Sequence, residues 1–181
     1  MATGHTDPHR RDRILAATLD LIAEEGVAGV SHRKIAARAQ VPLGSMTYHF
    51  TGIDDVLLEA FTRYSDHVVT LFEQHLSAAA TPDQAREAVT ELIHTLSEGP
   101  RRDLILQQEL YTLAARHEPY RLLCQRWMRR SRDLLEHHFL PPTARRLDAL
   151  IEGLTLHRAL DDTPSDRDLT REAVRRITTT P

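Results

Sequence analysis

The stretch from residue 31 to residue 50, SHRKIAARAQVPLGSMTYHF, most constrains what this chain can fold into. Its first half places three apolar residues at helical spacing, Ile35, Ala36 and Ala39. Ser31 stands ahead of them as a candidate N-cap, because its hydroxyl can accept from the amides of the first turn. Pro42 then interrupts the pattern, since proline disfavours helix in the residue before it and is tolerated at the start of a new one. The stretch therefore predicts two short helices separated by a turn.

The second of these helices, over residues 43–49, is predicted to have a small, polar outer face and an apolar inner face. The outer residues are Gly44, Ser45, Thr47, Tyr48 and His49, and the inner ones are Leu43, Met46 and Phe50. A short helix, a tight turn and a second helix with a hydrogen-bonding face form the plan of the helix-turn-helix, whose second helix enters the major groove of DNA. By periodicity alone, a plain helical hairpin fits this stretch equally well.

The residues of this region resemble the N-terminal domain of the TetR family of transcriptional regulators. The resemblance is carried by Val30-Ser31-x-x-x-Ile35-Ala36-x-x-Ala39-x-Val41 and by Gly44-Ser45-Met46-Thr47-Tyr48-His49-Phe50. It extends over residues 10–61, whereas the remainder resembles the family only in length, helicity and layout. The resemblance implies a DNA-binding domain over residues 1–52 and a helical ligand-binding and dimerisation domain over residues 53–181.

The resemblance also implies which residues contact DNA. Three residues match positions where the first motif helix meets the DNA backbone or the groove edge, namely Ser31, His32 and Arg33. Arg33 is the leading candidate, because a guanidinium can grip guanine O6 and N7. Groove-facing and phosphate-facing positions are matched by Leu43, Gly44, Ser45, Thr47, Tyr48 and His49. The chain departs from the family at Thr47, where many members have tyrosine, and at Ile53, where many have lysine.

Composition and charge limit the function classes. Of the 181 residues 41% are hydrophobic and only 5% aromatic, and the seven glycines and nine prolines are few turn-formers, which favours an all-α fold. The net charge is −3, and the first 50 residues carry six Lys and Arg against five Asp and Glu. Such a weak positive charge predicts moderate non-specific affinity for DNA. We expect the bases to lie near phosphates and Glu24 and Glu25 to lie at the far end of the preceding helix.

Nothing in the sequence indicates a membrane or secreted protein. No apolar run approaches the ~18 residues that a membrane span needs, and the start MATGHTDPHRRD has no apolar signal-peptide core. The single cysteine, Cys124, excludes an internal disulfide framework and fits a reducing cytoplasm. We therefore expect a cytoplasmic protein with no membrane partner.

Apolar periodicity predicts nine helices and no strand. The first begins at Arg10 and ends at Gly26, a favourable residue after a helix C-terminus. A helix of more than 20 residues follows Asp54 and is long enough, at ~1.5 Å per residue, to link two domains. Later helices are expected to be capped by Thr81, Thr143 and Ser165.

If the second domain follows the family, it holds a pocket for an unidentified small-molecule effector. Such pockets are mostly apolar, with a few polar groups that fix orientation. The polar and aromatic side chains nearest to the predicted inner faces are Tyr64, His67, His94, Gln107, Tyr111, Trp127 and His157. Tyr111 and Trp127 are the leading candidates, although an aromatic residue at helical spacing is more often ordinary core.

The last two predicted helices resemble the dimerisation helices of the family. Residues 144–154 carry two apolar rows, and Gly153 permits the close approach of another helix. These rows fit either an internal core helix or an isologous homodimer, and we favour the homodimer because palindromic operators require two-fold proteins. The expected interface residues are Leu147, Leu150, Ile151, Gly153, Leu154, Leu169 and Val174.

Motifs for catalysis or metal binding are missing from the sequence. The eleven histidines form no tight ligand set with a carboxylate on one helix face, so we expect no metal and no cofactor. A nucleophile elbow and a Gly-rich phosphate loop are also missing, which argues against an enzyme. The leading hypothesis is a ligand-responsive repressor that binds a palindromic, double-stranded DNA operator as a dimer. The alternatives are a helical small-molecule- or partner-binding protein that has lost DNA readout, and a helical hydrolase or metal enzyme.

Overall fold

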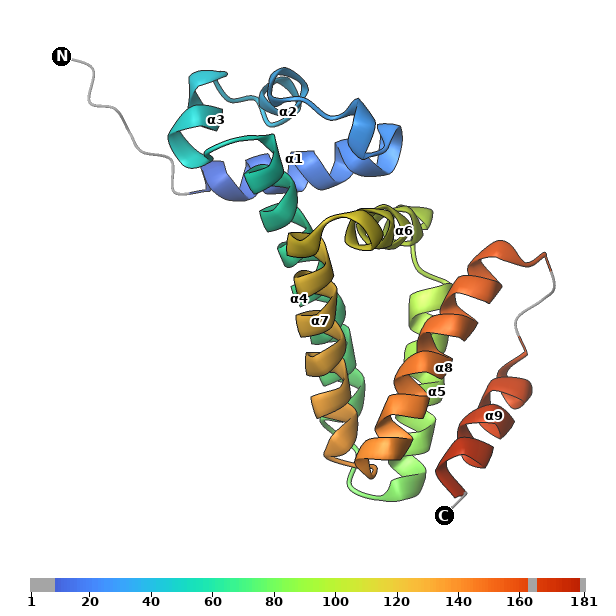
Figure 1. Ribbon diagram of the computed structural model, residues 1–181. Helices are drawn as coiled ribbons and strands as arrows, with labels where there is room; N and C mark the ends of the chain where they lie inside the picture. Colours follow the sequence, from blue (N-terminus) through green and yellow to red (C-terminus); the bar gives the residue numbers. More distant parts are fainter. Residues whose placement is uncertain (1–8, 163–165, 180–181) are drawn as a thin grey trace. The chain divides into compact units, whose positions relative to one another are not determined.

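The computed structural model describes residues 9–162 and 166–179, and within these ranges it contains nine α-helices, one 3₁₀ turn and no strand (Figure 1). The predicted all-α fold is confirmed. The α-helices are α1 Arg10–Glu25, α2 His32–Arg38, α3 Gly44–His49, α4 Ile53–Leu76, α5 Pro82–Ser97, α6 Arg101–Arg116, α7 Glu118–Glu136, α8 Pro141–Leu160 and α9 Arg167–Thr179. None of the helices in these ranges is long and apolar enough to cross a membrane.

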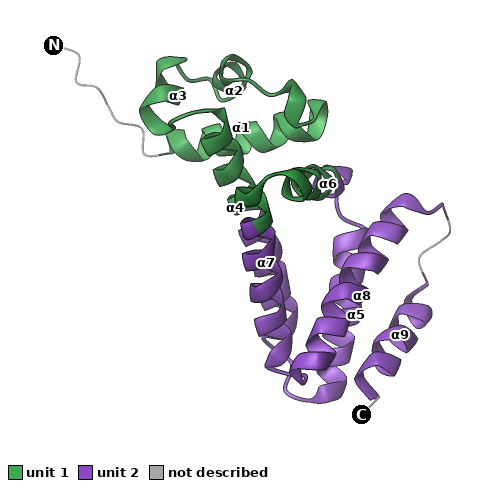
Figure 2. Ribbon diagram, viewed as in Figure 1, with its two compact units in different colours: residues 1–64, 105–121 green, residues 65–104, 122–181 purple. Residues whose placement is uncertain are grey.

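The chain forms two compact units (Figure 2). The first comprises residues 1–64 and 105–121, and the second comprises residues 65–104 and 122–181. Helices α4, α6 and α7 each contribute residues to both units. This division follows contacts within the chain, whereas the division by function into residues 1–52 and 53–181 stays a prediction.

An apolar core holds the helix-turn-helix of the first unit in shape. Five of its fully buried side chains come from α1 to α4, namely Ile14, Ile22, Ile35, Met46 and Phe61. Tyr120, at the start of α7, packs edge-on against Phe61 with ring centroids 6.1 Å apart. Each such side chain contributes about 1.5–3 kcal/mol when buried, so the orientation of α3 is set by the apolar residues beneath it.

Local signals in the sequence set several helix ends as predicted. Helix α1 ends at Gly26, whose amide donates to the Ile22 carbonyl over 2.9 Å. Ser31 caps α2, because its hydroxyl accepts from the Lys34 amide at 3.4 Å. Thr81 caps α5 in a capping box with Gln84, in which each side chain accepts from the other residue's amide.

Two predicted caps had different outcomes. Thr143 does not cap α8, because the helix already begins at Pro141 and proline suits the first helical positions, where no amide donor is needed. Ser165 lies outside the described residues. Next to it, the Asp166 carboxylate accepts from the amides of Asp168 and Leu169 at 2.9 and 3.0 Å and so caps the first turn of α9.

The second unit is organised around α5, which packs against both α8 and α9 (Figure 1). Leu92 and Ile93 of α5 are fully buried, as is Leu147 of α8. Polar side chains reinforce the packing, because Arg158 of α8 lies 2.9 Å from the Nε2 atom of buried His94 and donates to the Asp166 carbonyl at 2.8 Å. These contacts join α5, α8 and the start of α9.

Candidate functional site

The predicted recognition helix α3 presents a small exposed face. Tyr48 is 78% exposed and Leu43, which precedes the helix, is 52% exposed. Thr47 is also exposed, and its hydroxyl donates to the Gly44 carbonyl at 3.1 Å. The ring of His49 lies edge-on to that of Tyr48 with centroids 4.9 Å apart, which restrains the tyrosine. This face therefore presents the Thr47 hydroxyl, the Tyr48 phenol and the apolar side chain of Leu43 to a DNA groove.

Ser45 does not share that face. Ser45 is only 7% exposed, and the next residue, Met46, is fully buried. Its side chain therefore lies on the inner side of α3, and the expectation that Ser45 faces the groove is wrong for this conformation. Periodicity placed it outside because a serine is polar, but in so short a helix its small side chain fits under the turn.

The basic residues of α2 have different surroundings. Arg38 donates to both oxygens of Glu24, over 2.9 and 2.6 Å, and its guanidinium lowers the pKa of that carboxyl. Lys34 forms an ion pair with Glu25 and donates to the Gly29 carbonyl at 2.9 Å. Glu24 and Glu25 lie at the far end of α1, as expected, and the structure adds that their carboxylates pair with two cations of α2.

Arg33 is the exception on α2. Its side chain is exposed, and within the described residues it forms no hydrogen bond or ion pair. His32, next to it, is half-buried, and its Nε2 atom is buried without a hydrogen-bond partner among the described residues. Arg33 is therefore the side chain of α2 that is free to reach a base or a phosphate.

A guanidinium braces the end of the recognition helix. Arg11 of α1 donates through Nε to Glu59 of α4 at 2.7 Å, and its guanidinium carbon lies 5.0 Å from the ring centroid of Phe50. The Glu59 carboxylate raises the pKa of Arg11, which keeps it charged. Phe50 follows α3 directly, so this contact fixes the direction in which the chain leaves the helix.

Another contact in the first unit was not expected from the sequence. Glu109 of α6 accepts from the Val27 amide at 3.2 Å, although 82 residues separate them. Val27 lies in the linker between α1 and α2. Apolar periodicity carries no signal for such a pair, because it depends on where α6 lies in the fold.

The seven predicted effector residues are divided between the two units. Tyr64, Gln107 and Tyr111 belong to the first unit, and His67, His94, Trp127 and His157 belong to the second. Within the chain, Tyr64, His94 and Trp127 are buried, Gln107 and Tyr111 are half-buried, and the two remaining histidines, His67 and His157, are exposed. The expectation that His67 and His157 lie inside a pocket of the single chain is therefore wrong, because both are exposed.

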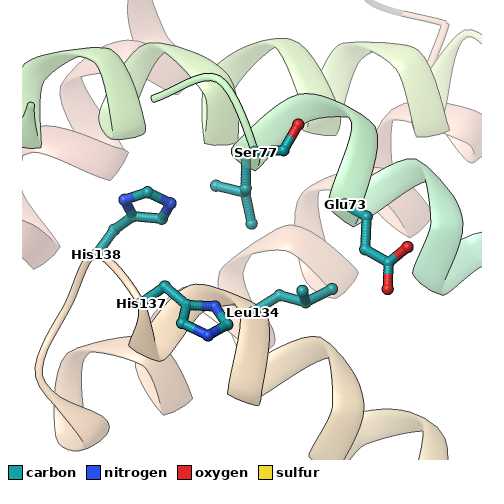
Figure 3. A pocket seen from close by; sticks show the side chains of 6 residues that line it. Glu73, Ser77, Leu134, His137 and His138 are labelled. Carbon is teal, nitrogen blue, oxygen red and sulfur yellow. The ribbon is translucent and has the colours of Figure 1, made fainter. Parts of the chain in front are cut away.

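A pocket of about 320 Å³ opens elsewhere in the second unit, at the C-terminal ends of α4 and α7 (Figure 3). It is lined by Glu73, Leu76, Ser77, Leu134, His137 and His138. It contains none of the seven predicted residues. The sequence offered only the adjacent histidines as a signal, and these were expected to be solvated.

The predicted dimer residues fall into two groups. Leu147, Ile151 and Val174 are buried inside the chain, so their assignment to an interface is wrong, because α5 already covers that row of α8 and α9. Leu169 is 65% exposed, whereas Leu150, Leu154 and Gly153 are half-buried. A Cβ added at Gly153 would meet no atom within 4 Å, so this side of α8 is open to another helix.

Comparison with known proteins gives two matching family models. The model for bacterial regulatory proteins of the tetR family matches residues 14–60. The model for the tetracyclin repressor-like C-terminal domain matches residues 80–180, which is more than half of the chain. The two models together take in α1 to α3 and most of the second unit.

Individual relatives agree with these models. A candidate transcriptional regulator from Streptomyces coelicolor A3(2) is 69% identical, and its crystal structure gives a TM-score of 0.91 over 96% of this chain and 100% of that one. The multidrug binding protein EbrR, solved with ethidium, is 36% identical, with a TM-score of 0.77 over 94% of this chain and 99% of its own. The transcriptional regulator PksA of Bacillus subtilis is 25% identical over 91% of this chain and 86% of its own length. A match to an uncharacterized regulator of Xanthobacter autotrophicus, 27% identical over 60% of this chain, spans only 55% of that relative.

Proposed function

Because the chain belongs to the TetR family of DNA-binding transcriptional regulators, we propose that it is an effector-responsive repressor that binds a palindromic operator as a homodimer. The observation that carries the proposal is the exposed surface formed by Arg33, Leu43, Thr47 and Tyr48 on a helix-turn-helix. We name this surface the reading face. It combines one free guanidinium with an exposed recognition helix.

The chemistry of the reading face suggests how an operator is recognised. Arg33 can donate two hydrogen bonds to the O6 and N7 atoms of one guanine. Leu43 and the methyl group of Thr47 fit against thymine methyl groups, and the phenol of Tyr48 can donate to a base edge or a phosphate. The short side chains elsewhere on α3 leave room for water-mediated contacts and for readout of DNA shape.

The test is selection of bound sequences from a random DNA pool at about 0.1–0.15 M salt. We expect the wild-type protein to recover a palindrome whose half-sites lie about one helical turn, ~34–36 Å, apart or a multiple of it. Arg33→Ala and Tyr48→Phe are each expected to weaken binding to that operator by about 10- to 100-fold, and Arg33→Ala is expected to relax selection at its guanine.

A matched control comes from the second unit. Arg129 is an exposed arginine in the second-unit part of α7, and Arg129→Ala removes the same charge without changing a residue of the reading face. Its operator affinity is expected to stay within about two-fold of the wild type at this salt. Recovery of no preferred sequence by folded protein would contradict operator recognition and favour a partner-binding protein.

The homodimer is proposed to use the open side of α8 and α9. Leu154 and Gly153 lie there, with the exposed Leu160 and Leu169. Leu154→Glu is expected to give monomers in sedimentation equilibrium, because a charge buried in an interface is strongly unfavourable. Leu122→Glu, at an exposed leucine of α7, is the control and is expected to stay dimeric. A dimeric Leu154→Glu protein would place the interface elsewhere.

The class of effector is proposed from similarity. EbrR has been solved with ethidium, malachite green and proflavin, which are aromatic organic cations. Since the two chains are about a third identical over nearly their whole lengths, we propose that this protein also responds to such cations. Operator affinity then falls only by the difference in effector affinity between the DNA-binding and released conformations.

A further inference from the structure

Three side chains of α8 that can bind a ligand lie on one side of the helix. Asp148, Glu152 and Thr155 are four and three residues apart, which at about 100° per residue puts them within an arc of about 60°. Asp148 and Glu152 are half-buried, and Thr155 is 9% exposed. Asp148 and Glu152 are the only acidic residues of α8, so the negative charge of the helix is confined to this arc. We call the three residues the acidic face of α8.

The hydroxyl of Thr155 has no use within the chain. Its Oγ1 atom is buried and has no hydrogen-bond partner among the described residues. Threonine in a helix ordinarily donates to the carbonyl four residues earlier, as Thr90 does to Arg86 at 3.0 Å. A buried hydroxyl without a partner is destabilising, and a bound water or a ligand that hydrogen-bonds to it removes that cost.

Helix α7 places one cation and one thiol near the acidic face. The Nη1 atom of Arg132 lies 3.9 Å from the carboxylate of Asp148. Burial raises the pKa of Asp148 to about 6 despite that arginine, and the charge of Glu152 adds to the rise. Burial also raises the pKa of the Cys124 thiol to about 11, with a contribution from Glu152. The acidic face therefore places two carboxylates next to each other on one side of α8, with Arg132 beside Asp148.

We propose that the effector binds at the acidic face of α8, with its positive charge against Asp148 and Glu152 and a hydrogen-bonding group against the Thr155 hydroxyl. This inference rests on the proposed effector-responsive function and names the residues that select an organic cation. All the groups involved lie in the second unit. Trp127 lies one turn from Cys124 on α7 and is buried, and an indole is the kind of aromatic ring that attracts such cations.

An organic cation fits the acidic face better than a metal ion or an anion. Within residues 9–162 and 166–179, no three His, Cys, Asp or Glu side chains are placed to hold a metal. An anion would be repelled by the two carboxylates. A protonated or quaternary nitrogen on an apolar scaffold needs only one or two carboxylates and is weakly hydrated, so it loses little on entering a half-buried site.

The test is titration of the full-length protein with ethidium, followed by its fluorescence, for the wild type and three variants. Asp148→Asn and Glu152→Gln keep the shapes of the side chains and are each expected to raise the Kd for ethidium by about 10- to 100-fold. Thr155→Val is expected to raise it by about three- to ten-fold. Unlike a purely structural loss, it is also expected to raise the melting temperature without ethidium, because it removes an unsatisfied buried hydroxyl.

Two controls separate this site from others. Glu73→Gln removes the carboxylate of the pocket at the ends of α4 and α7 and is expected to leave the Kd unchanged. Anilinonaphthalene sulfonate, an aromatic anion, is expected to respond alike to all variants. Melting curves show whether each variant is folded. If Asp148→Asn or Glu152→Gln does not fold, the isosteric Thr155→Val still tests the site through its Kd for ethidium.

Three results would overturn the inference. The first is that the folded Asp148→Asn and Glu152→Gln variants both bind ethidium as tightly as the wild type. The second is that only Glu73→Gln loses ethidium binding. The third is that the wild type shows no saturable ethidium binding up to about 1 mM. Selection of a DNA palindrome by the same protein is measured independently. If the palindrome is recovered and ethidium does not bind, the inference about the acidic face is wrong, whereas the proposal of operator binding is supported.

Discussion

Gly26 connects α1 to the helix-turn-helix through a backbone conformation that only glycine adopts readily. Its dihedral angles are φ +71° and ψ 167°, which is the region of positive φ that side chains exclude. A Cβ built on Gly26 would also lie 3.1 Å from an oxygen of Glu109. Gly26→Ala is therefore expected to strain the backbone and to push away the carboxylate that accepts from the Val27 amide.

The expected size of this effect follows from its two parts. A residue forced into this region costs about 1–3 kcal/mol. Losing the hydrogen bond that the Val27 amide donates to Glu109 costs about 0.5–1.5 kcal/mol more. A total of about 1.5–4.5 kcal/mol, at an m value of about 2 kcal/mol/M for urea, lowers the urea midpoint by about 0.8–2.3 M. The measurement is urea unfolding followed by circular dichroism.

Two further variants separate the parts. Gly52→Ala is the control, because a Cβ there meets no atom within 4 Å and the backbone φ is not positive, so we expect a change below about 0.5 kcal/mol. Glu109→Ala removes only the hydrogen bond to the Val27 amide. In the double variant Gly26→Ala/Glu109→Ala, the new methyl group no longer meets the Glu109 carboxylate, so only the backbone strain at residue 26 is added. A Gly26→Ala protein that unfolds at the wild-type midpoint would refute the assignment of strain to Gly26.

Three other predictions concern capping, charge and pH. Ser31→Ala removes the cap of α2 and is expected to cost about 1 kcal/mol in urea unfolding. Replacing Glu24 and Glu25 with glutamine frees two cations of α2, so fluorescence anisotropy on random-sequence DNA should show tighter binding and a salt slope steeper by up to about two. The pKa of Cys124 is raised to about 11, so the folded state favours the protonated thiol. The stability gained from the protonated thiol is complete below the unfolded pKa of about 8.5 and is lost as pH rises towards 11. Between these two pH values the urea midpoint of the wild type should therefore fall more than that of Cys124→Ala.

The helix-turn-helix was predictable from the sequence because its determinants are local. The apolar spacing around Ile35 and Met46, the cap at Ser31 and the glycine after α1 each act on residues near them in the sequence. The helices α1 to α3 are therefore encoded locally, whereas the contact between Glu109 and Val27 depends on a distant part of the chain. The exposed places of Arg33 and Tyr48 on the surface could be anticipated for the same reason.

The sites of the second unit were less predictable, because periodicity shows which residues are apolar but not which neighbour covers them. Helix α8 carries apolar residues on more than one side, and α5 covers the side with Leu147 and Ile151, leaving Leu154 more open. The acidic face was overlooked because two acids four residues apart usually indicate a solvated helix surface. Their significance depends on the burial of Thr155 and on the opposing residues of α7, which only the fold supplies.

The ion pairs of α2 bear on how this protein finds its operator. With Lys34 and Arg38 held by Glu25 and Glu24, only Arg33 among the basic residues of α2 in the described chain is free for DNA. Each phosphate contact that is not made removes about 0.9 from the salt slope and lowers the affinity for all sequences alike. Contacts made by the reading face to bases are unaffected by this loss. The internal pairing therefore lowers specific and non-specific binding by the same factor, so this chain, whose net charge is −3, depends on the base contacts of the reading face for its discrimination between sequences.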